Sequence, residues 1–495
     1  MAVPKVLGIE TEYGVVLRGA AESNPVLASS ILINSYVEHH RVGWDFEDES
    51  PGRDARGFAR AGAQPPEIET HLVNTVLTNG ARYYVDHAHP EYSAPETVNA
   101  LECMIADKAG ERILARSMQA ASRVLGEGQE VVVYKNNSDG KGNSYGTHEN
   151  YLMDRAVPFT NIVRVMIPWF VTRQVFTGAG KIGAENGAAA VGYQLSQRAD
   201  FFEEEVGLET TLKRPIVNTR DEPHSDPAAY RRLHVIVGDA NLCEVATFLK
   251  LGTTAIVLAM VEDNFLDKDF SIVNSVPAMR AVSHDPTLRA TVELQEGGRV
   301  SALDLQWEFL RLARKYADDV GLELCGGDEV GALVLDRWER VLHGLETDPR
   351  TLAGQLDWVT KLDILEAYRE RDDLDGDDPK LALLALQYHD MRPQRSLYEK
   401  LVRAGKVERM VDEATVIDAI TNPPESTRAY FRGTCLAKWP DSVVAANWDS
   451  IILDVGKDPL RRIPMMEPLR GTRAHVEGLF EECTTPAALV ARLGS

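Results

Sequence analysis

The hydrophobic and polar positions along the chain repeat with two different periods, and each period predicts one kind of element. Alternation with a period of two predicts strands over Lys5–Leu17, Ala81–Asp86, Glu130–Tyr134, Leu233–Val237 and Thr427–Phe431. Apolar residues three or four apart predict helices over Val98–Leu125, Glu244–Glu262, Ala302–Asp318, Thr351–Arg371 and Pro379–Asp390. Strands interleaved with long helices, without regular alternation, predict an α+β fold with an antiparallel or mixed sheet.

Two segments lack both periods. Residues 47–72 are rich in charged residues, glycine and proline, so we expect a long mobile loop there. A loop of this length is usually functional or disordered, and we predict that it lies near the site and tunes access or turnover. The NPPEST segment at residues 422–427 predicts a hinge before a small C-terminal region.

The strand period also places ionisable side chains on shared faces, because residues two apart on a strand point the same way. Glu10 and Glu12 of GIETEYG therefore share a face, and so do Arg82, Tyr84 and Asp86. The same spacing joins further polar residues in three segments: Arg232 with His234, His148 with Asn150, and Arg428 with Tyr430 and Arg432. Several strands are thus predicted to present one polar face.

The carboxylates of this predicted face have two interpretations each. Glu10 and Glu12 could form a solvated sheet face. Alternatively, two like charges beside apolar neighbours call for a cation, and they could bind Mg²⁺ with Glu91 as a further ligand. Asp86 could be an ion-pair partner of Arg82, or a carboxylate that acts as base or nucleophile. The residues alone leave these alternatives open.

The other polar side chains of this face are equally open to two interpretations. Its arginines could make surface ion pairs one by one, or together bind phosphate oxygens in bidentate fashion. Its histidines could be structural or belong to a site, and Trp448 could lie in the core or stack on a purine. Only the combination of these residues points to a function.

Charge and cysteine content exclude several classes of protein. The 53 lysines and arginines against 75 aspartates and glutamates give a net charge of −22, which argues against binding to nucleic acid or anionic membranes. The five cysteines are widely spaced without a CxxC pair, which favours a location in the reducing cytosol. The first residues have no apolar signal core, and the most apolar stretch, Thr254–Val261, is shorter than the roughly 18 residues of a membrane span. We expect a cytoplasmic protein.

Five long motifs give the sequence a resemblance to a known family. They are GIETEYG, LTNGARYYVDHAHPEYSAPE, YKNNSDGKGNSYGTHENYL, GLETTLKRPIVNTRDEPH through RRLHVIVGDANL, and TRAYFRG through NWDSIILD. Together they resemble the Pup ligase/depupylase family, which is related to glutamine synthetase; Pup is the small prokaryotic ubiquitin-like protein. The long insertion before LTNGARYY and the short DHAHP spacing resemble the deamidase/depupylase branch, whereas GIETEYG is closer to the ligase version.

The resemblance implies an ATP- and Mg²⁺-dependent amidohydrolase that deamidates the C-terminal Gln of Pup and cleaves Pup from lysines. ATP, or ADP plus phosphate, would be retained as a cofactor, and the partners would be Pup and pupylated proteins. A Pup–protein ligase is the alternative, and a small-molecule carboxylate–amine ligase comes third. The implied fold is a glutamine synthetase-like curved antiparallel sheet with helices on its convex side over residues 1–425. A small C-terminal domain over residues 426–495 would contribute to the nucleotide site.

The resemblance also implies a role for individual residues. Asp86 matches the catalytic aspartate. Glu10 and Glu91 match metal ligands, and Tyr84 matches a residue beside the metal; Glu12, on the same predicted face as Glu10, is a further candidate ligand. The residues implied at the nucleotide are Arg82, His148, His234, Arg432, Trp448 and Ala94, of which Ala94 could make contact only through its backbone.

The net charge acquires a second meaning from this resemblance, because Pup is itself acidic. Two acidic proteins repel, so the docking surface for Pup should be locally basic. The candidate substrate-binding residues lie within twenty positions of one another: Lys213, Arg214, Arg220, Arg231 and Arg232. The alternative is that they are scattered surface cations.

Overall fold

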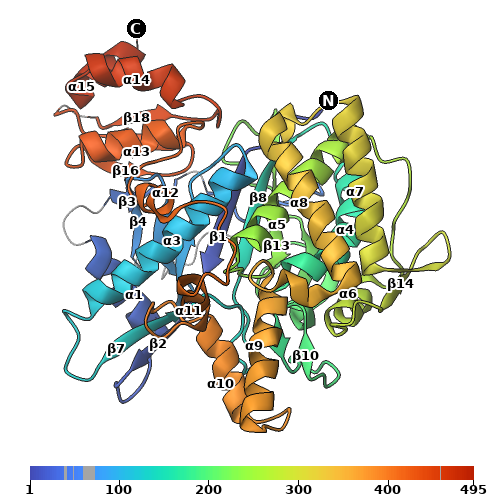
Figure 1. Ribbon diagram of the computed structural model, residues 1–495. Coiled ribbons are helices and arrows are strands. Elements are labelled where there is room, and N and C mark those ends of the chain that lie inside the picture. The colour runs from blue at the N-terminus through green and yellow to red at the C-terminus, as the bar shows by residue number, and fades with distance from the viewer. Residues whose placement is uncertain (38–41, 48, 60–72, 457–458, 495) are drawn as a thin grey trace.

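A computed structural model describes residues 1–37, 42–47, 49–59, 73–456 and 459–494. A ten-stranded sheet runs through this part of the chain (Figure 1). Its strands are, in spatial order, β13 (Tyr230–Gly238), β8 (Thr147–Asp154), β1 (Leu7–Glu12), β6 (His89–Ser93), β5 (Arg82–Asp86), β4 (Asn74–Val76), β3 (Val42–Trp44), β16 (Val443–Ala446), β17 (Ser450–Leu453) and β18 (Arg461–Pro464). Among their recorded pairings only β3 with β16 is parallel, which confirms an α+β fold with a mostly antiparallel sheet.

Four pairs of shorter strands lie outside this sheet. They are β2 (Gly14–Arg18) with β7 (Glu130–Tyr134), β9 (Lys181–Ile182) with β10 (Tyr193–Gln194), β11 (Phe202–Gly207) with β12 (Arg214–Asn218), and β14 (Thr291–Glu293) with β15 (Arg299–Ser301). The single strand predicted over Lys5–Leu17 is therefore two strands, β1 and β2. The chain changes sheet at Tyr13, whose N–H donates to Pro90 O at 3.0 Å.

Helices form the rest of the fold, and the five predicted ones are confirmed with shifts of several residues at some ends. Helix α3 packs against β1 and β7, and α5 packs against β8 and α3. The α-helices are α1 (Pro25–Val37), α3 (Ala100–Ala121), α4 (Phe159–Thr177), α5 (Glu244–Glu262), α6 (Ser275–Ser283), α7 (Ala302–Asp319), α8 (Asp328–Thr347), α9 (Asp357–Asp372), α10 (Pro379–Tyr388), α11 (Leu397–Arg403), α12 (Glu413–Asp418), α13 (Ala429–Lys438), α14 (Arg473–Glu482) and α15 (Pro486–Leu493). Short 3₁₀ helices are η1 (Ala199–Phe201), η2 (Glu323–Cys325) and η3 (Pro349–Leu352).

Helix α5 is the centre of the core. All 19 of its residues are buried, and Asp357 caps its N-terminus by accepting the N–H groups of Leu242 and Cys243. It is longer than the apolar stretch singled out from the sequence. Within the described ranges it is the one helix with the length and apolar composition of a membrane span, and the whole of its apolar stretch is buried inside the protein.

The C-terminal segment corrects one prediction. Residues 427–431 were predicted as a strand, but α13 begins at Ala429, and Arg428 is its N-cap residue. Arg428 and Arg432 still share a face because they are four apart on a helix, whereas Tyr430 packs elsewhere, against Phe480. The Thr, Tyr and Phe of this short run favour strands locally, and the helix is fixed by the apolar residues that follow.

The same segment is joined to the large sheet. It has its own core around Trp439 and Ile451, yet that core includes Val42 and Trp44 of β3. In Figure 1 the orange and red elements α13 to α15 form a lobe beside β3 and β4. The predicted hinge at residues 422–427 is held by side chains, since Thr427 Oγ1 donates to Glu96 O at 2.8 Å. The division at residue 425 stays a prediction.

Candidate active site

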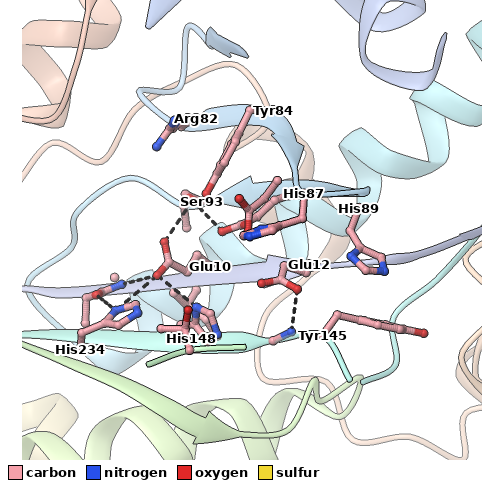
Figure 2. A pocket seen from close by; sticks show the side chains of 18 of the residues that line it. Glu10, Glu12, Arg82, Tyr84, His87, His89, Ser93, Tyr145, His148 and His234 are labelled. Carbon is pink, nitrogen blue, oxygen red and sulfur yellow. Dashed lines mark hydrogen bonds and ion pairs between the residues drawn. The ribbon is translucent and has the colours of Figure 1, made fainter. Parts of the chain in front are cut away.

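Strand β1 carries the centre of the site because its residues alternate between the core and a polar face. Glu10 and Glu12 point to the polar face, and both neighbouring strands place polar residues opposite them. Glu10 lies opposite Ser93 of β6 and His148 of β8, and Glu12 lies opposite Glu91 of β6. Figure 2 shows Glu10 between Ser93 on one side and His148 on the other, with Glu12 further along the strand. The polar face predicted from strand phase is present.

A two-residue turn at His87 and Ala88 brings the end of β5 to the carboxylates of β1. Antiparallel pairing of β5 with β6 places Tyr84 opposite Glu91. Glu91 lies on β6, because the turn is completed by two residues, with His87 at a φ of 52°. Asp86, the last residue of β5, therefore faces the same space as Glu91.

Glu12, Asp86 and Glu91 form a carboxylate group whose nearest oxygens all lie within 4.8 Å of one another. Burial, followed by the charges of Asp86 and its neighbours, raises the pKa of Glu91 well above its ordinary value. Burial alone would also raise the pKa of Asp86, but its hydrogen bond to His87 holds that pKa below the ordinary value. Three carboxylates this close repel each other, and oxygen ligands of this kind suit a hard divalent cation.

A second group lies beside the first and adds nitrogen ligands. Nδ1 of His148 and Nδ1 of His234 each lie 3.5 Å from Glu10 Oε1. Burial would raise the pKa of Glu10, but the hydrogen bond with His148 holds it well below its ordinary value. Burial and the charge of Arg232 lower the pKa of His234, which is therefore neutral at pH 7. These three residues could also hold a metal ion between them.

A cavity of about 1070 Å³ is lined by both groups and by aromatic residues next to Arg82. The guanidinium carbon of Arg82 lies 4.0 Å from the ring centroid of Trp44 and 3.9 Å from that of Tyr84. The rings of Trp44 and Trp448 meet edge to face at 5.3 Å. Arg82 and Trp448 thus offer a cation and a partly exposed aromatic surface to the same cavity, which suits phosphate and a purine base.

Two residues implied at the nucleotide have other contacts. Ala94 lines the cavity, but its N–H donates to Ile9 O at 2.8 Å, so only its carbonyl and methyl group are available. Arg432 is fully buried behind Trp448, donates to Trp448 O at 3.1 Å and makes an ion pair with Glu96. Arg432 supports the aromatic surface rather than lining the cavity, because α13 points it away from the polar face.

The four arginines predicted to bind the substrate do not all line the cavity. Arg214, Arg220 and Arg232 line the cavity, but Arg231 does not, because β13 turns it to the opposite face, where it donates to a backbone carbonyl at 2.9 Å. Glu222 pairs with Arg220 at 2.7 Å and lies 3.9 Å from Arg232. Of the four predicted arginines, only Arg214 lines the cavity without a carboxylate within 4.0 Å in the described part of the chain.

The first part of the predicted 47–72 loop docks beside the site. Asp54 Oδ2 accepts a hydrogen bond from Thr219 Oγ1 at 2.7 Å, and Glu222 Oε1 accepts one from the N–H of Ser50 at 2.5 Å. Glu49 lines the cavity. Residues 48 and 60–72 lie outside the described residues, and so does most of the segment predicted to be mobile.

The chain is similar to proteins of one known family. The family described as Pup-ligase protein matches residues 5–452. The chain belongs to the Pup-ligase family. Among its relatives, a depupylase of Acidothermus cellulolyticus is 55% identical over 501 residues, which cover 99% of each chain. A Pup deamidase/depupylase of Mycolicibacterium smegmatis is 46% identical over 500 residues, again 99% of each chain.

Two solved structures of Pup ligases have a similar fold. A crystal structure of Pup in complex with its ligase matches with a TM-score of 0.81 and 31% identity, over 99% of this chain and 94% of the other. A Pup ligase in complex with ADP matches with a TM-score of 0.76 and 34% identity, over 83% of this chain and 90% of the other. The folds agree closely although two thirds of the residues differ.

Sequence reasoning about this Pup-ligase family chain missed three parts of the site. Arg198 lines the cavity from the segment just before η1, and no strand or helix period singles it out. Trp44 stacks on Arg82, and Glu96 holds the arginines behind Trp448. Glu96 is the one that could have been found, because it ends the LTNGARYYVDHAHPEYSAPE motif as a carboxylate in an otherwise apolar and proline-containing run.

Proposed function

We propose that this chain is an ATP- and Mg²⁺-dependent amidohydrolase that deamidates the C-terminal Gln of Pup and cleaves the bond between Pup and lysines of modified proteins. Similarity supports the hydrolase branch, since relatives named as depupylases are 55% and 46% identical, and the solved ligases 31% and 34%. The observation that carries the proposal is Asp86, whose carboxylate lies within 4.8 Å of Glu12 and Glu91 in the large cavity.

Both reactions break the same bond, the amide bond at the side-chain carbonyl of the last residue of Pup. The leaving group is ammonia in deamidation and a lysine amine in depupylation. Water supplies the oxygen that completes the carboxylate and the proton that goes to the leaving nitrogen. Asp86 either attacks the carbonyl carbon, giving an anhydride that water opens, or accepts the proton of the attacking water.

The geometry supports an assignment of the residues that would hold the cofactors. Glu10, Glu12 and Glu91 would hold Mg²⁺, and Arg82 and Trp448 would bind the nucleotide. The fit to a cation rests on Glu91, which is buried among carboxylates and is relieved of their repulsion by positive charge. Bound Mg²⁺ supplies positive charge where negative charge develops on the carbonyl oxygen.

The test uses the full chain with Pup ending in Gln, ATP and Mg²⁺, and mass spectrometry follows the conversion of Gln to Glu. We expect conversion by the unmodified enzyme and none by Asp86→Asn, which keeps the shape of the side chain. Nucleotide affinity should be retained in Asp86→Asn. The matched control is Asp377→Asn, an exposed aspartate between α9 and α10, which should deamidate at the unmodified rate.

A parallel reaction separates the hydrolase from a ligase. Pup ending in Glu is incubated with a lysine-containing protein and ATP, and a preformed Pup conjugate is tested alongside. The proposal predicts cleavage of the conjugate. Accumulation of new conjugate with stoichiometric ADP, and no deamidation, would instead identify a Pup–protein ligase.

We also propose a cytoplasmic location. All five cysteines are free and buried, and none is placed to form a disulfide within the described residues. Proteins built this way suit a reducing compartment. Fractionation of cells should therefore recover the activity in the cytosolic fraction.

A further inference from the structure

Arg198 and Arg214 face the cavity, and their only hydrogen-bond partners in the described part of the chain are neutral. Arg198 Nε donates to Ser144 Oγ at 3.2 Å, and its Nη1 donates to Ile236 O. Arg214 donates to Thr210 O and to Ser144 O, both at 2.9 Å. Among the residues that the structure describes, neither guanidinium has a carboxylate within 4.0 Å, and no protein acceptor contacts Arg198 Nη2 or Arg214 Nη1.

This arrangement differs from that of Arg173 and Arg432, two other buried arginines. Arg173 is paired with Glu149, and Arg432 is paired with Glu96. Arg198 is only 1% exposed, and burial followed by the charge of Arg214 lowers its pKa to about 10, so it stays charged at pH 7. Two unpaired cations at a partly buried position are costly, and an anion that enters the cavity would offset the cost.

The position of the pair identifies which part of the cavity that anion would occupy. Ser144, which both arginines contact, lies two residues before Gly146, whose N–H donates to Glu12 Oε2 at 3.0 Å. The pair therefore lies on the Glu12 side of the site. Figure 2 shows Glu12 beside Tyr145 and apart from Arg82, which lines the opposite part of the cavity.

We propose that Arg198 and Arg214 bind the free α-carboxylate of the residue whose side-chain amide is cleaved. The proposal rests on the function proposed above. A C-terminal glutamine carries two groups, the α-carboxylate and the side-chain amide, separated by a short flexible stem. Holding the α-carboxylate beside Glu12 brings the amide carbonyl to Asp86. The same pair rejects a glutamine within a chain, because such a residue has no free α-carboxylate.

The experiment compares two forms of Pup ending in Gln, one with a free α-carboxylate and one with an α-carboxamide. Side-chain deamidation of each is followed by mass spectrometry, and kcat/KM is determined for each enzyme variant. The unmodified enzyme should prefer the free acid by about 10- to 100-fold, the range expected for a charge-assisted hydrogen bond. Arg214→Gln should lose that factor on the free acid and show no preference between the substrates.

Further variants keep the test independent of folding. Arg198→Gln should behave like Arg214→Gln, and Arg214, which is only partly buried, remains informative if Arg198→Gln fails to fold. The matched control is Arg289→Gln, which removes one positive charge from an exposed arginine outside the cavity and should keep the full preference. ADP affinity is measured for each variant by calorimetry.

Three results would overturn the inference. The first is an unmodified enzyme that deamidates both substrates equally well. The second is an arginine variant that is slower but keeps the preference for the free acid. The third is a variant with weakened ADP affinity and unchanged preference, which would identify the pair as a phosphate site. An unmodified enzyme that deamidates neither substrate would refute the proposed function itself.

Discussion

Replacing Glu96 with glutamine tests how α13, and with it Trp448, is held to the sheet. Glu96 Oε1 accepts a hydrogen bond from Arg428 Nε at 2.7 Å, and Glu96 Oε2 contacts Arg432 Nη2. The two arginines are 2% and 0% exposed. Glu96→Gln keeps the shape of the side chain but leaves two buried guanidinium groups without a counter-charge.

The magnitude follows from the pKa of Glu96. Burial alone would raise it, but the charges of Arg432 and Arg428 lower it from 4.5 to about 2. Because one pKa unit corresponds to about 1.36 kcal/mol, the ionised carboxylate stabilises the folded state by about 3 kcal/mol. Breaking a buried ion pair costs a similar amount, about 3–5 kcal/mol. Since folding lowers this pKa, the stabilisation is complete above pH 4.5 and is lost as the pH falls toward 2.

Hydrogen–deuterium exchange of the α13 amides measures this effect locally. At pH 7 we expect Glu96→Gln to lower their protection by about two orders of magnitude, and the difference from the unmodified protein should shrink below pH 4.5. The control is Glu425→Gln, which breaks an exposed pair with Arg473, worth at most about 1 kcal/mol. Equal exchange of α13 in the two variants would refute the reasoning.

Three further changes give distinct results. Burial lowers the pKa of Lys361 to about 7, so the unfolded chain holds this proton up to pH 10.5 and stability should rise with pH between those values. In Lys361→Met, the unfolding free energy from urea titrations should rise less steeply with pH over this range. An unchanged pH dependence would contradict the assignment. Glu91→Gln should raise the melting temperature in metal-free buffer and abolish the further rise with Mg²⁺; if Mg²⁺ still stabilises the variant, Glu91 is not a ligand. Trp448→Ala should weaken ADP binding about 10- to 100-fold by calorimetry if its ring stacks on the base, whereas unchanged affinity would place the base elsewhere.

Strand phase predicted much of the site because β1, β5 and the first part of β13, up to Val235, are regular strands. Once Glu10, Glu12 and Asp86 are assigned to strands, the period of two fixes their direction, and only the pairing of the strands is missing. Which strands pair, and in what register, is determined by the tertiary structure. It is the register of β6 against both β1 and β5 that brings Glu91 to Glu12 and Asp86, and a single sequence does not contain that register.

The parts that could not be predicted depend on contacts between distant segments. Arg432 was assigned to the polar face from five residues of strand-favouring sequence, too short a window to exclude a helix. Arg198 reaches the cavity from an irregular segment. The ion pair of Arg220, by contrast, could have been predicted, because its partner Glu222 lies two residues away on the same face of an extended segment.

The parallel pairing of β3 with β16 has a consequence for synthesis of the chain. Gly43 and Trp44 pair with Ala445 and Ala446. During synthesis, β3 therefore has no partner on this side until some four hundred further residues have been added. Until then β3 is an open edge on the nascent protein, able to pair with another chain. Truncation before β16 should therefore yield aggregation rather than a smaller folded enzyme. The last tenth of the chain covers a sheet edge that the first tenth leaves open.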